Sequence, residues 1–216
     1  MNTYGVIFDM DGVIFNTEEV WRDGYNVANK IFGFDVDENY RKTLCGKSEE
    51  DIRKELYKKY PDKDVDAYRD YVAKYVNLKI ETGEFQIKPH FIEIISYLKE
   101  KGYKTMLATS NTMQRAEKMF MKKGLEIHDF FDSYVFADEV QGKSKPDPYI
   151  FHLAATKLGF KAENCYVIED SMNGIEAAVK GGFKAIMDVD LIEPNDYAKK
   201  HCINIIYNLE ELKNIL

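Results

Sequence analysis

Two aspartates stand two residues apart near the start of the chain, in the run Val6-Ile7-Phe8-Asp9-Met10-Asp11-Gly12-Val13. Carboxylates this close repel each other, so both stay ionised only if a cation or a dense set of donors offsets the repulsion; otherwise one is protonated. The pair suits either a metal site or a nucleophile beside an acid/base residue. A lone Asp-x-Asp is more often a strand ending in a polar turn, because such short matches frequently arise by chance.

Other polar groups also stand directly after short apolar runs that favour strands. They are Thr109-Ser110-Asn111, Glu169-Asp170-Ser171 and, in a longer loop, Lys145. Ligands of a parallel sheet bind beyond the carboxyl ends of its strands. We therefore expect these groups to gather with the aspartate pair at one edge of a sheet, which favours a functional site over an accidental match.

The acidic members of this set are suitable ligands for a hard divalent cation. They are Asp9, Asp11, Glu169 and Asp170. Mg²⁺ prefers oxygen ligands and keeps positions for water and phosphate. The sequence thus predicts a magnesium site built from carboxylates.

A lysine beside these acids makes sense if a phosphate also binds there. Lys145, a hydroxyl of Thr109 or Ser110, and backbone N–H groups at a helix start could hold phosphate oxygens. Phosphoryl transfer needs mainly positioning and charge neutralisation. One carboxylate could then attack phosphorus while its neighbour moves protons.

The elements that must position these groups alternate between strand and helix patterns. Tyr4–Phe8 is an uninterrupted apolar run, too short for a helix, and predicts a buried strand. Further strands are expected at Lys104–Ala108, Tyr134–Phe136, Tyr166–Ile168, Ala185–Met187 and Ile203–Ile206. Helices are expected from Pro89 to Gly102 and at Met113–Lys123, Tyr149–Leu158, Gly174–Lys180 and Leu209–Leu216. This order predicts an α/β fold, a Rossmann-like doubly wound parallel sheet covered on both faces.

One stretch after the first strand departs from this alternation. Helix patterns occupy Thr17–Phe32, the residues after Ser48, and Val65–Ile80, and no strong strand candidate interrupts them. We therefore predict a core domain of residues 1–15 and 85–216 with an inserted α-helical domain of residues 16–84.

Composition and charge argue against a nucleic-acid partner and against contact with a membrane. The 216 residues carry 30 basic and 37 acidic side chains, a net charge of −7, so nucleic acid is not expected as a partner. The start lacks a basic leader, and no apolar stretch approaches the ~20 residues that span a bilayer. Three scattered cysteines show no metal-ligand spacing. We expect a cytoplasmic protein without membrane contact.

In combination, the motifs resemble those of the haloacid dehalogenase superfamily, and most closely its β-phosphoglucomutase-like phosphatases and mutases. They are Asp9-Met10-Asp11-Gly12-Val13, the strand exit at Thr109, Lys145-Pro146-Asp147-Pro148, and Ile168-Glu169-Asp170-Ser171 with Gly174-Ile175. The likeness covers the whole chain in motif order and spacing. The helical insertion looks like the cap domain of that family.

The resemblance implies a role for each residue. Asp9 would be the nucleophile that forms an aspartyl-phosphate, and Asp11 would protonate the leaving oxygen and later accept a proton. Asp9, the backbone carbonyl of Asp11 and Asp170 would hold Mg²⁺, with Glu169 in or beside that shell. The residues that would bind the phosphoryl group are Thr109, Ser110, Asn111 and Lys145.

The same residues discriminate between the chemistries of the family. Dehalogenases and phosphonate-cleaving relatives lack the second acid, so Asp11 favours phosphate esters. The related sugar-phosphate mutase carries a cap histidine and a cap arginine where this chain has Trp21 and Glu49. An acid there would repel the second phosphate of a bisphosphate, although Lys47, Lys74 or Lys79 could compensate.

We therefore predict a Mg²⁺-dependent phosphatase that acts on a small phosphorylated metabolite, a sugar phosphate, as a monomer. The alternative is a β-phosphoglucomutase-type sugar phosphomutase. A weaker alternative is a phosphometabolite-binding protein without turnover, since such proteins usually lose one of the two acids that this chain keeps. Closure of the insertion over substrate is expected to hinge near Asn16 and Phe85.

Overall fold

The computed structural model describes residues 4–45 and 49–216. The chain divides into two compact units, one of residues 1–16 and 86–216 and the other of residues 17–85. These divisions fall one residue after the boundaries that the sequence analysis proposes. We call the first the core unit and the second the helical unit, and each is described by itself.

The core unit is built on a six-stranded parallel sheet with the order β3-β2-β1-β4-β5-β6. The strands are β1 (Gly5–Phe8), β2 (Lys104–Ala108), β3 (Ser133–Val135), β4 (Cys165–Glu169), β5 (Lys184–Asp188) and β6 (Asn204–Ile206). The strand order reverses direction at β1, which lies between β2 and β4. The prediction of a doubly wound parallel sheet is confirmed.

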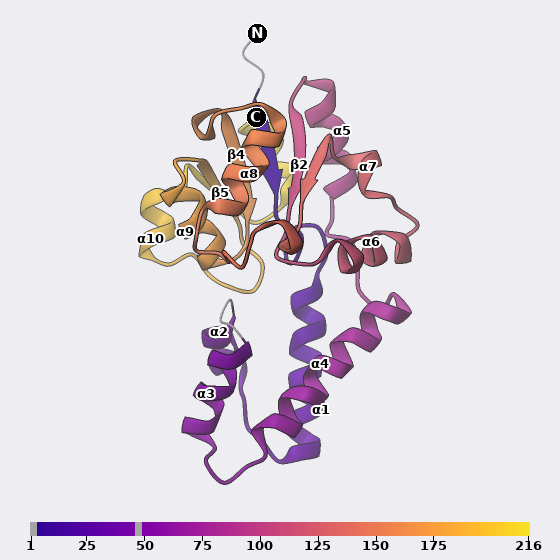
Figure 1. Ribbon diagram of the computed structural model, residues 1–216, viewed down its shortest axis with the longest axis vertical. Helices are drawn as coiled ribbons and strands as arrows, with labels where there is room; N and C mark the ends of the chain where they lie inside the picture. The colour runs from indigo at the N-terminus through magenta and orange to yellow at the C-terminus, as the bar shows by residue number, and fades with distance from the viewer. Residues whose placement is uncertain (1–3, 46–48) are drawn as a thin grey trace. The chain divides into compact units, whose positions relative to one another are not determined.

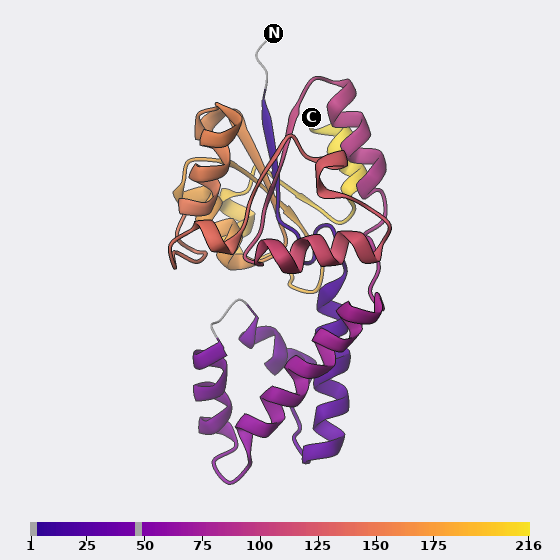
Figure 2. The same cartoon turned by 45° about the vertical axis from the view of Figure 1, so that its right-hand side comes forward.

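Helices cover both faces of this sheet. They are α5 (Phe91–Glu100), α6 (Met113–Lys122), α7 (Ile127–Phe130), α8 (Tyr149–Leu158), α9 (Met172–Lys180) and α10 (Asp196–His201). Figures 1 and 2 show α8 and α9, in orange, on one side of the sheet, and α5 with the C-terminal segment on the other. Short 3-10 helices are η1 (Ala137–Glu139), η2 (Ala162–Asn164) and η3 (Leu209–Asn214).

The strand β1 lies in the interior of the sheet, and the side chains on both of its faces are apolar. Val6, Ile7 and Phe8 are fully buried. Ile7 belongs to a cluster with residues of α8 and α9, whereas the ring of Phe8 packs near that of Phe131, with 6.1 Å between centroids. A strand without a polar face must lie inside the sheet, and this fixes the position of the residue that follows it, Asp9.

The helical unit has a hydrophobic core of its own. Its helices are α1 (Thr17–Phe32), α2 (Glu38–Leu44), α3 (Glu49–Lys59) and α4 (Val65–Thr82). Tyr25, Leu56 and Tyr68 are buried in this core, and Phe34 stacks on Tyr68 at 4.1 Å. No helix in the described part of the chain is long and apolar enough to cross a membrane.

The two chain segments that lead into and out of residues 17–85 are paired within the core unit. The Asn16 N–H donates to the Gln86 carbonyl at 3.1 Å, and the Gln86 N–H donates to Asn16 Oδ1 at 2.7 Å. Phe15 and Ile87 form an antiparallel bridge beside them. The chain therefore leaves the core unit and returns to it at the same position, where Asn16 and Gln86 are hydrogen-bonded to each other.

Candidate active site

Three carboxylates converge at the carboxyl ends of β1 and β4. Asp9 follows β1, Glu169 ends β4, and Asp170 comes next. One oxygen from each lies within 4.8 Å of the others, and all three residues are buried. The two strands are neighbours with Phe8 opposite Ile168, so residues far apart in sequence arrive at the same level of the sheet.

Lys145 lies among these carboxylates. Its Nζ is 2.6 Å from Asp9 Oδ1 and 2.7 Å from Glu169 Oε1, and its side chain is only 8% exposed. The structure thus brings together the lysine and three of the four acids that the sequence analysis placed at one edge of the sheet, while the Asp11 carboxylate accepts from Asn111.

The charges of this cluster do not balance. With all three carboxylates ionised, one ammonium group leaves two negative charges in excess. Burial raises the pKa of Asp9 to about 7; Lys145 opposes this shift, while Glu169 and Asp11 add to it. Burial lowers the pKa of Lys145, but Asp9 and Glu169 more than offset it and hold that pKa above its usual value. A buried group of oxygen donors with an excess of two negative charges fits a divalent cation.

Gly12 leaves room for Asp170 in this cluster. Its φ is +78°, and its N–H donates to the Phe15 carbonyl at 2.8 Å, closing the turn after the aspartate pair. A Cβ at this position would lie 2.1 Å from Asp170 Oδ2. Glycine is therefore required here for the backbone conformation and for the approach of the carboxylate.

Both oxygens of Glu169 accept hydrogen bonds inside the core unit. Oε1 accepts from Lys145, and Oε2 accepts from the N–H and the hydroxyl of Ser171, at 2.7 and 2.9 Å. A Cβ on Gly174 would come within 1.8 Å of Oε1. Glu169 therefore holds Lys145 and the loop after β4 in place, a role that sequence reasoning missed and that Ser171 two residues on could have suggested.

The residues after β2 are connected to the aspartate pair through Asn111. The Thr109 side chain is buried, and its hydroxyl accepts from the Asn111 N–H at 3.1 Å and from Asn111 Nδ2 at 3.0 Å. Asn111 Nδ2 also donates to Asp11 Oδ2. Ser110, between them, is exposed. All three predicted phosphate-binding residues of this loop thus lie at the end of β2, and two are connected to Asp11.

Asn111 is not the N-cap of the helix that follows it. Thr112 is the N-cap of α6, and its side chain accepts from the Arg115 N–H at 3.3 Å. The Asn111 amide is directed to Asp11 instead.

Cap residues named in the sequence analysis lie in the helical unit. Trp21 is half-buried and Glu49 forms an ion pair with Arg69. Lys79 pairs with Glu84, and Lys47 lies outside the described residues, as do Gly46 and Ser48.

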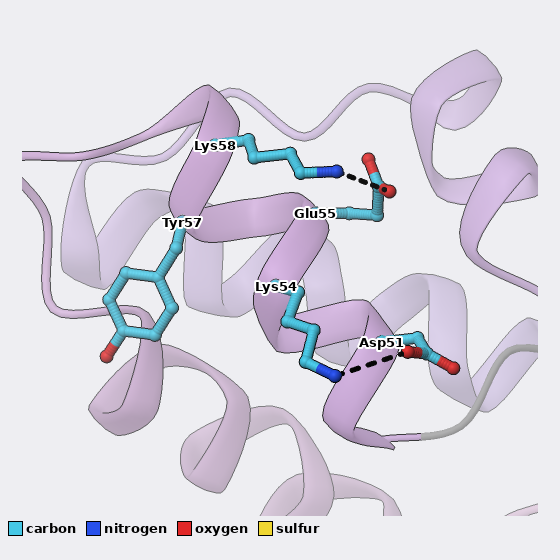
Figure 3. A pocket seen from close by; sticks show the side chains of 5 residues that line it. All are labelled: Asp51, Lys54, Glu55, Tyr57 and Lys58. Atoms are coloured by element: carbon cyan, nitrogen blue, oxygen red, sulfur yellow. Dashed lines mark hydrogen bonds and ion pairs between the residues drawn. The ribbon is translucent and has the colours of Figure 1, made fainter.

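A hollow on the surface of α3 is not a candidate for chemistry. Its lining residues are Asp51, Lys54, Glu55, Tyr57 and Lys58 (Figure 3). Lys54 pairs with Asp51 at 3.8 Å and Lys58 with Glu55 at 3.3 Å, all with side chains 38% exposed or more. Exposed pairs of this kind contribute about 0–1 kcal/mol and leave a solvated helix face.

Known proteins are similar to this chain in sequence and in fold. The family model described as "Hydrolase: haloacid dehalogenase-like hydrolase" matches residues 5–182. The phosphorylated carbohydrates phosphatase of Thermotoga maritima is 30% identical over 185 residues, which cover 85% of this chain and 84% of that protein. Protein CbbY of Cereibacter sphaeroides is 30% identical over 191 residues, covering 84% and 82%. A crystal structure of a presumed β-phosphoglucomutase from Thermotoga maritima has a TM-score of 0.76 and 27% identity, covering 99% of this chain and 98% of that one.

Proposed function

This chain belongs to the haloacid dehalogenase-like hydrolase family and is a phosphoric monoester hydrolase, and we propose that it removes phosphate from a phosphorylated sugar through an aspartyl-phosphate on Asp9. The observation that supports the proposal most strongly is the buried contact of Lys145 with Asp9 beside Asp170. A carboxylate nucleophile, a cation for phosphate and a metal-binding acid are what such a reaction needs.

Asp9 is the nucleophile in this proposal. A carboxylate oxygen attacks phosphorus, the bond from phosphorus to the sugar oxygen breaks, and an aspartyl-phosphate remains. Water then attacks the same phosphorus, the bond to Asp9 breaks, and inorganic phosphate is released. The Lys145 ammonium group, which contacts Asp9 Oδ1, orients the carboxylate and offsets charge on the phosphoryl oxygens.

Asp11 moves the protons. It donates one to the leaving sugar oxygen in the first step and accepts one from water in the second. Asn111 donates to Asp11 Oδ2 and so fixes the orientation of a carboxylate that is only partly buried. A partly exposed, oriented carboxylate is suited to general acid–base catalysis.

The donor set also fits Mg²⁺. Asp9, Asp170 and the Asp11 carbonyl would hold the ion, with Glu169 beside them. When bound, Mg²⁺ would supply the positive charge that draws in and polarises the phosphoryl group. The chain contributes the buried carboxylates and, at Gly12, the space that lets Asp170 approach.

A phosphomutase is the second candidate. The structural similarity to a presumed β-phosphoglucomutase supports it. Both reactions would use the same nucleophile and acid, and they differ in whether water or a sugar hydroxyl accepts the phosphoryl group.

The decisive experiment measures phosphate release from a generic aryl phosphate with and without Mg²⁺. We expect Mg²⁺-dependent release by the wild-type chain and none by Asp9→Asn, with both proteins giving the same circular dichroism spectrum. Equal, negligible release by both would indicate a binding protein. Conversion of β-glucose 1-phosphate to glucose 6-phosphate in the presence of a sugar bisphosphate would instead support the mutase.

A further inference from the structure

A second Asp-x-Asp sequence, Asp188-Val189-Asp190, stands at the carboxyl end of β5. Strands β4 and β5 are parallel neighbours, so this pair of acids reaches the same edge of the sheet as the residues that follow β4. The core unit thus carries two such acidic pairs, and the candidate active site uses only the one after β1.

The side chain of Asp188 lies on the side of the sheet that faces α5. Met187 belongs to the hydrophobic cluster that contains residues of α8 and α9. Because side chains alternate along a strand, Asp188 lies on the opposite side, where α5 and η3 pack together (Figures 1 and 2). The charged groups that act on Asp188 come from this surrounding: Lys88 just before α5, Glu211 in η3, and Asp190. None of them belongs to the candidate active site.

Two carboxylate oxygens of this cluster are buried without a donor. Asp188 is only 1% exposed. Asp188 Oδ2 and Asp190 Oδ2 are both buried and have no hydrogen-bond partner among residues 4–45 and 49–216. The other oxygen of Asp190, Oδ1, accepts from Lys88 Nζ at 2.7 Å, with both side chains at most 15% exposed. Buried polar atoms are nearly always paired with protein, water or an ion, so these two oxygens indicate a ligand.

The charges of the cluster also favour a cation. When both aspartates are ionised, Lys88 offsets one of them and leaves one negative charge in excess. Glu211 adds negative potential, although its Oε1 accepts from the Tyr207 N–H at 2.9 Å. Buried charge without a partner is costly, and one further positive charge would balance the two aspartates and the lysine.

A proton would meet these needs only in part. Burial raises the pKa of Asp188 to about 7, against the opposing charge of Lys88. A proton on Asp188 removes its charge but leaves Asp190 Oδ2 without a donor. A metal ion can contact one oxygen of each carboxylate, and hard cations prefer such oxygen ligands.

We infer that Asp188 and Asp190 form a second cation site in the core unit, which binds a monovalent metal ion, Na⁺ or K⁺. The ion contacts the two buried Oδ2 atoms and leaves the contact of Lys88 with Asp190 Oδ1 in place. It holds the residues after β5 beside the segment that leads into α5. The inference is independent of the proposed function, because binding at this site needs neither substrate nor turnover.

The test is thermal unfolding of the full chain at pH 8 with EDTA, in sodium, potassium or tetramethylammonium chloride of equal ionic strength. Tetramethylammonium is too large to enter a buried site and controls for screening. An ion at about ten times its dissociation constant raises the ratio of folded to unfolded chain about tenfold, and the Tm of a chain of this size by roughly 3–6 °C. We expect this rise for wild type in NaCl or KCl, and its loss in Asp188→Asn.

Two further variants make the result specific to this site. Asp190→Asn should lose the same rise, and it takes the place of Asp188→Asn if that variant does not fold. Asp9→Asn removes a carboxylate of the candidate active site and should keep the rise, which distinguishes the two acidic clusters.

Three results would overturn the inference. They are no rise for wild type in either salt, a rise that Asp188→Asn and Asp190→Asn both retain, and a rise that Asp9→Asn loses. Stabilisation by MgCl2 without EDTA, but not by NaCl or KCl, that is lost in Asp188→Asn would assign a divalent ion to the cluster and would likewise contradict it. The proposed function is decided separately, by phosphate release from an aryl phosphate.

Discussion

The Lys145 ammonium group is shared between two carboxylates that have different tasks. In the proposed reaction Asp9 is the nucleophile, whereas Glu169 accepts hydrogen bonds from Ser171 and from the lysine and so holds the lysine in place. Charge-assisted hydrogen bonds of this kind are short and direction-dependent. A nucleophile fixed at one oxygen by a buried lysine loses little conformational freedom when substrate arrives.

At Asp11, removal of the carboxylate should slow the reaction without disturbing the sheet. We expect Asp11→Ala to lower kcat by ~10²–10⁴-fold, because general acid–base groups contribute about this much. The measurement is turnover of a sugar phosphate with a poor leaving group. An aryl phosphate, whose leaving group needs little protonation, should show a smaller loss in the aspartyl-phosphate-forming step. Equal losses for both substrates would assign the proton transfer to another residue.

Asp188, at the end of β5, should make stability depend on pH. Its residue is 1% exposed; burial raises its pKa to about 7, Lys88 opposes the shift, and Asp190 and Glu211 add to it. An acid with a raised folded-state pKa stabilises the fold below its unfolded value of ~4, and this contribution is lost as the pH rises to ~7.

Asp188→Asn imitates the protonated acid and should remove this dependence. Between pH 5 and pH 8, the free energy of unfolding of the variant should gain ~2–3 kcal/mol relative to wild type. Urea denaturation at the two pH values measures the change, with Asp62→Asn, an exposed turn residue, as control. If the free energies of unfolding of wild type and Asp188→Asn change equally between the two pH values, the Asp188 carboxyl group does not titrate in this range.

Among the elements, those with a clear apolar run or an obvious stop were predicted best. The strand Lys104–Ala108 and the helix Tyr149–Leu158 have the bounds expected, the latter because Gly159 adopts φ +75° and ends it. The helix α2 was missed because only two of its residues, Arg41 and Leu44, are buried, which leaves no apolar period. The expected helix at Leu209–Leu216 is a 3-10 helix over Leu209–Asn214.

The residues of the candidate site could be predicted only in part, and strand position again decided which ones. Residues that directly follow a strand, such as Asp9 and Thr109, are positioned by the sheet, and sheet edges follow from strand order. The contact of Asn111 with Asp11 joins two loops and depends on side-chain direction, which a period of apolar residues does not encode. Local alternatives such as helix capping compete equally well in the sequence.

The turn after β1 should tolerate no side chain at Gly12. We expect Gly12→Ala to lower the stability by more than the ~1–2 kcal/mol of a left-handed backbone alone, and to abolish activity, because the new Cβ displaces Asp170. Gly102→Ala is the matched control: its φ is +83°, but a Cβ would meet nothing within 4 Å. It should show the backbone cost and retain activity. Equal stability losses in Gly12→Ala and Gly102→Ala would mean that Asp170 moves aside without a further cost in stability.

For the whole molecule, the net charge of −7 requires local cations to attract an anionic substrate. In the core unit these would be the buried Lys145 and, in the proposed reaction, a Mg²⁺ ion held by the carboxylates. Changes at these residues should therefore affect every phosphorylated substrate.

Substrate binding should also change the arrangement of the two units. We expect movement at Asn16 and Phe85, where the chain crosses between them, because closing an active site excludes water from the reaction. Small-angle X-ray scattering with Mg²⁺ and a phosphate analogue should show a smaller radius of gyration than without them. An unchanged radius of gyration would contradict the predicted movement at Asn16 and Phe85.

The pairing of Asn16 with Gln86 separates the sheet from the segment that lies between these two residues. All six strands lie within residues 5–8 and 104–206, so no strand pairing of the sheet involves that segment. The segment leaves and re-enters the core unit at one hydrogen-bonded position. Replacing it with another segment whose ends meet there would therefore leave every strand pairing of the sheet intact.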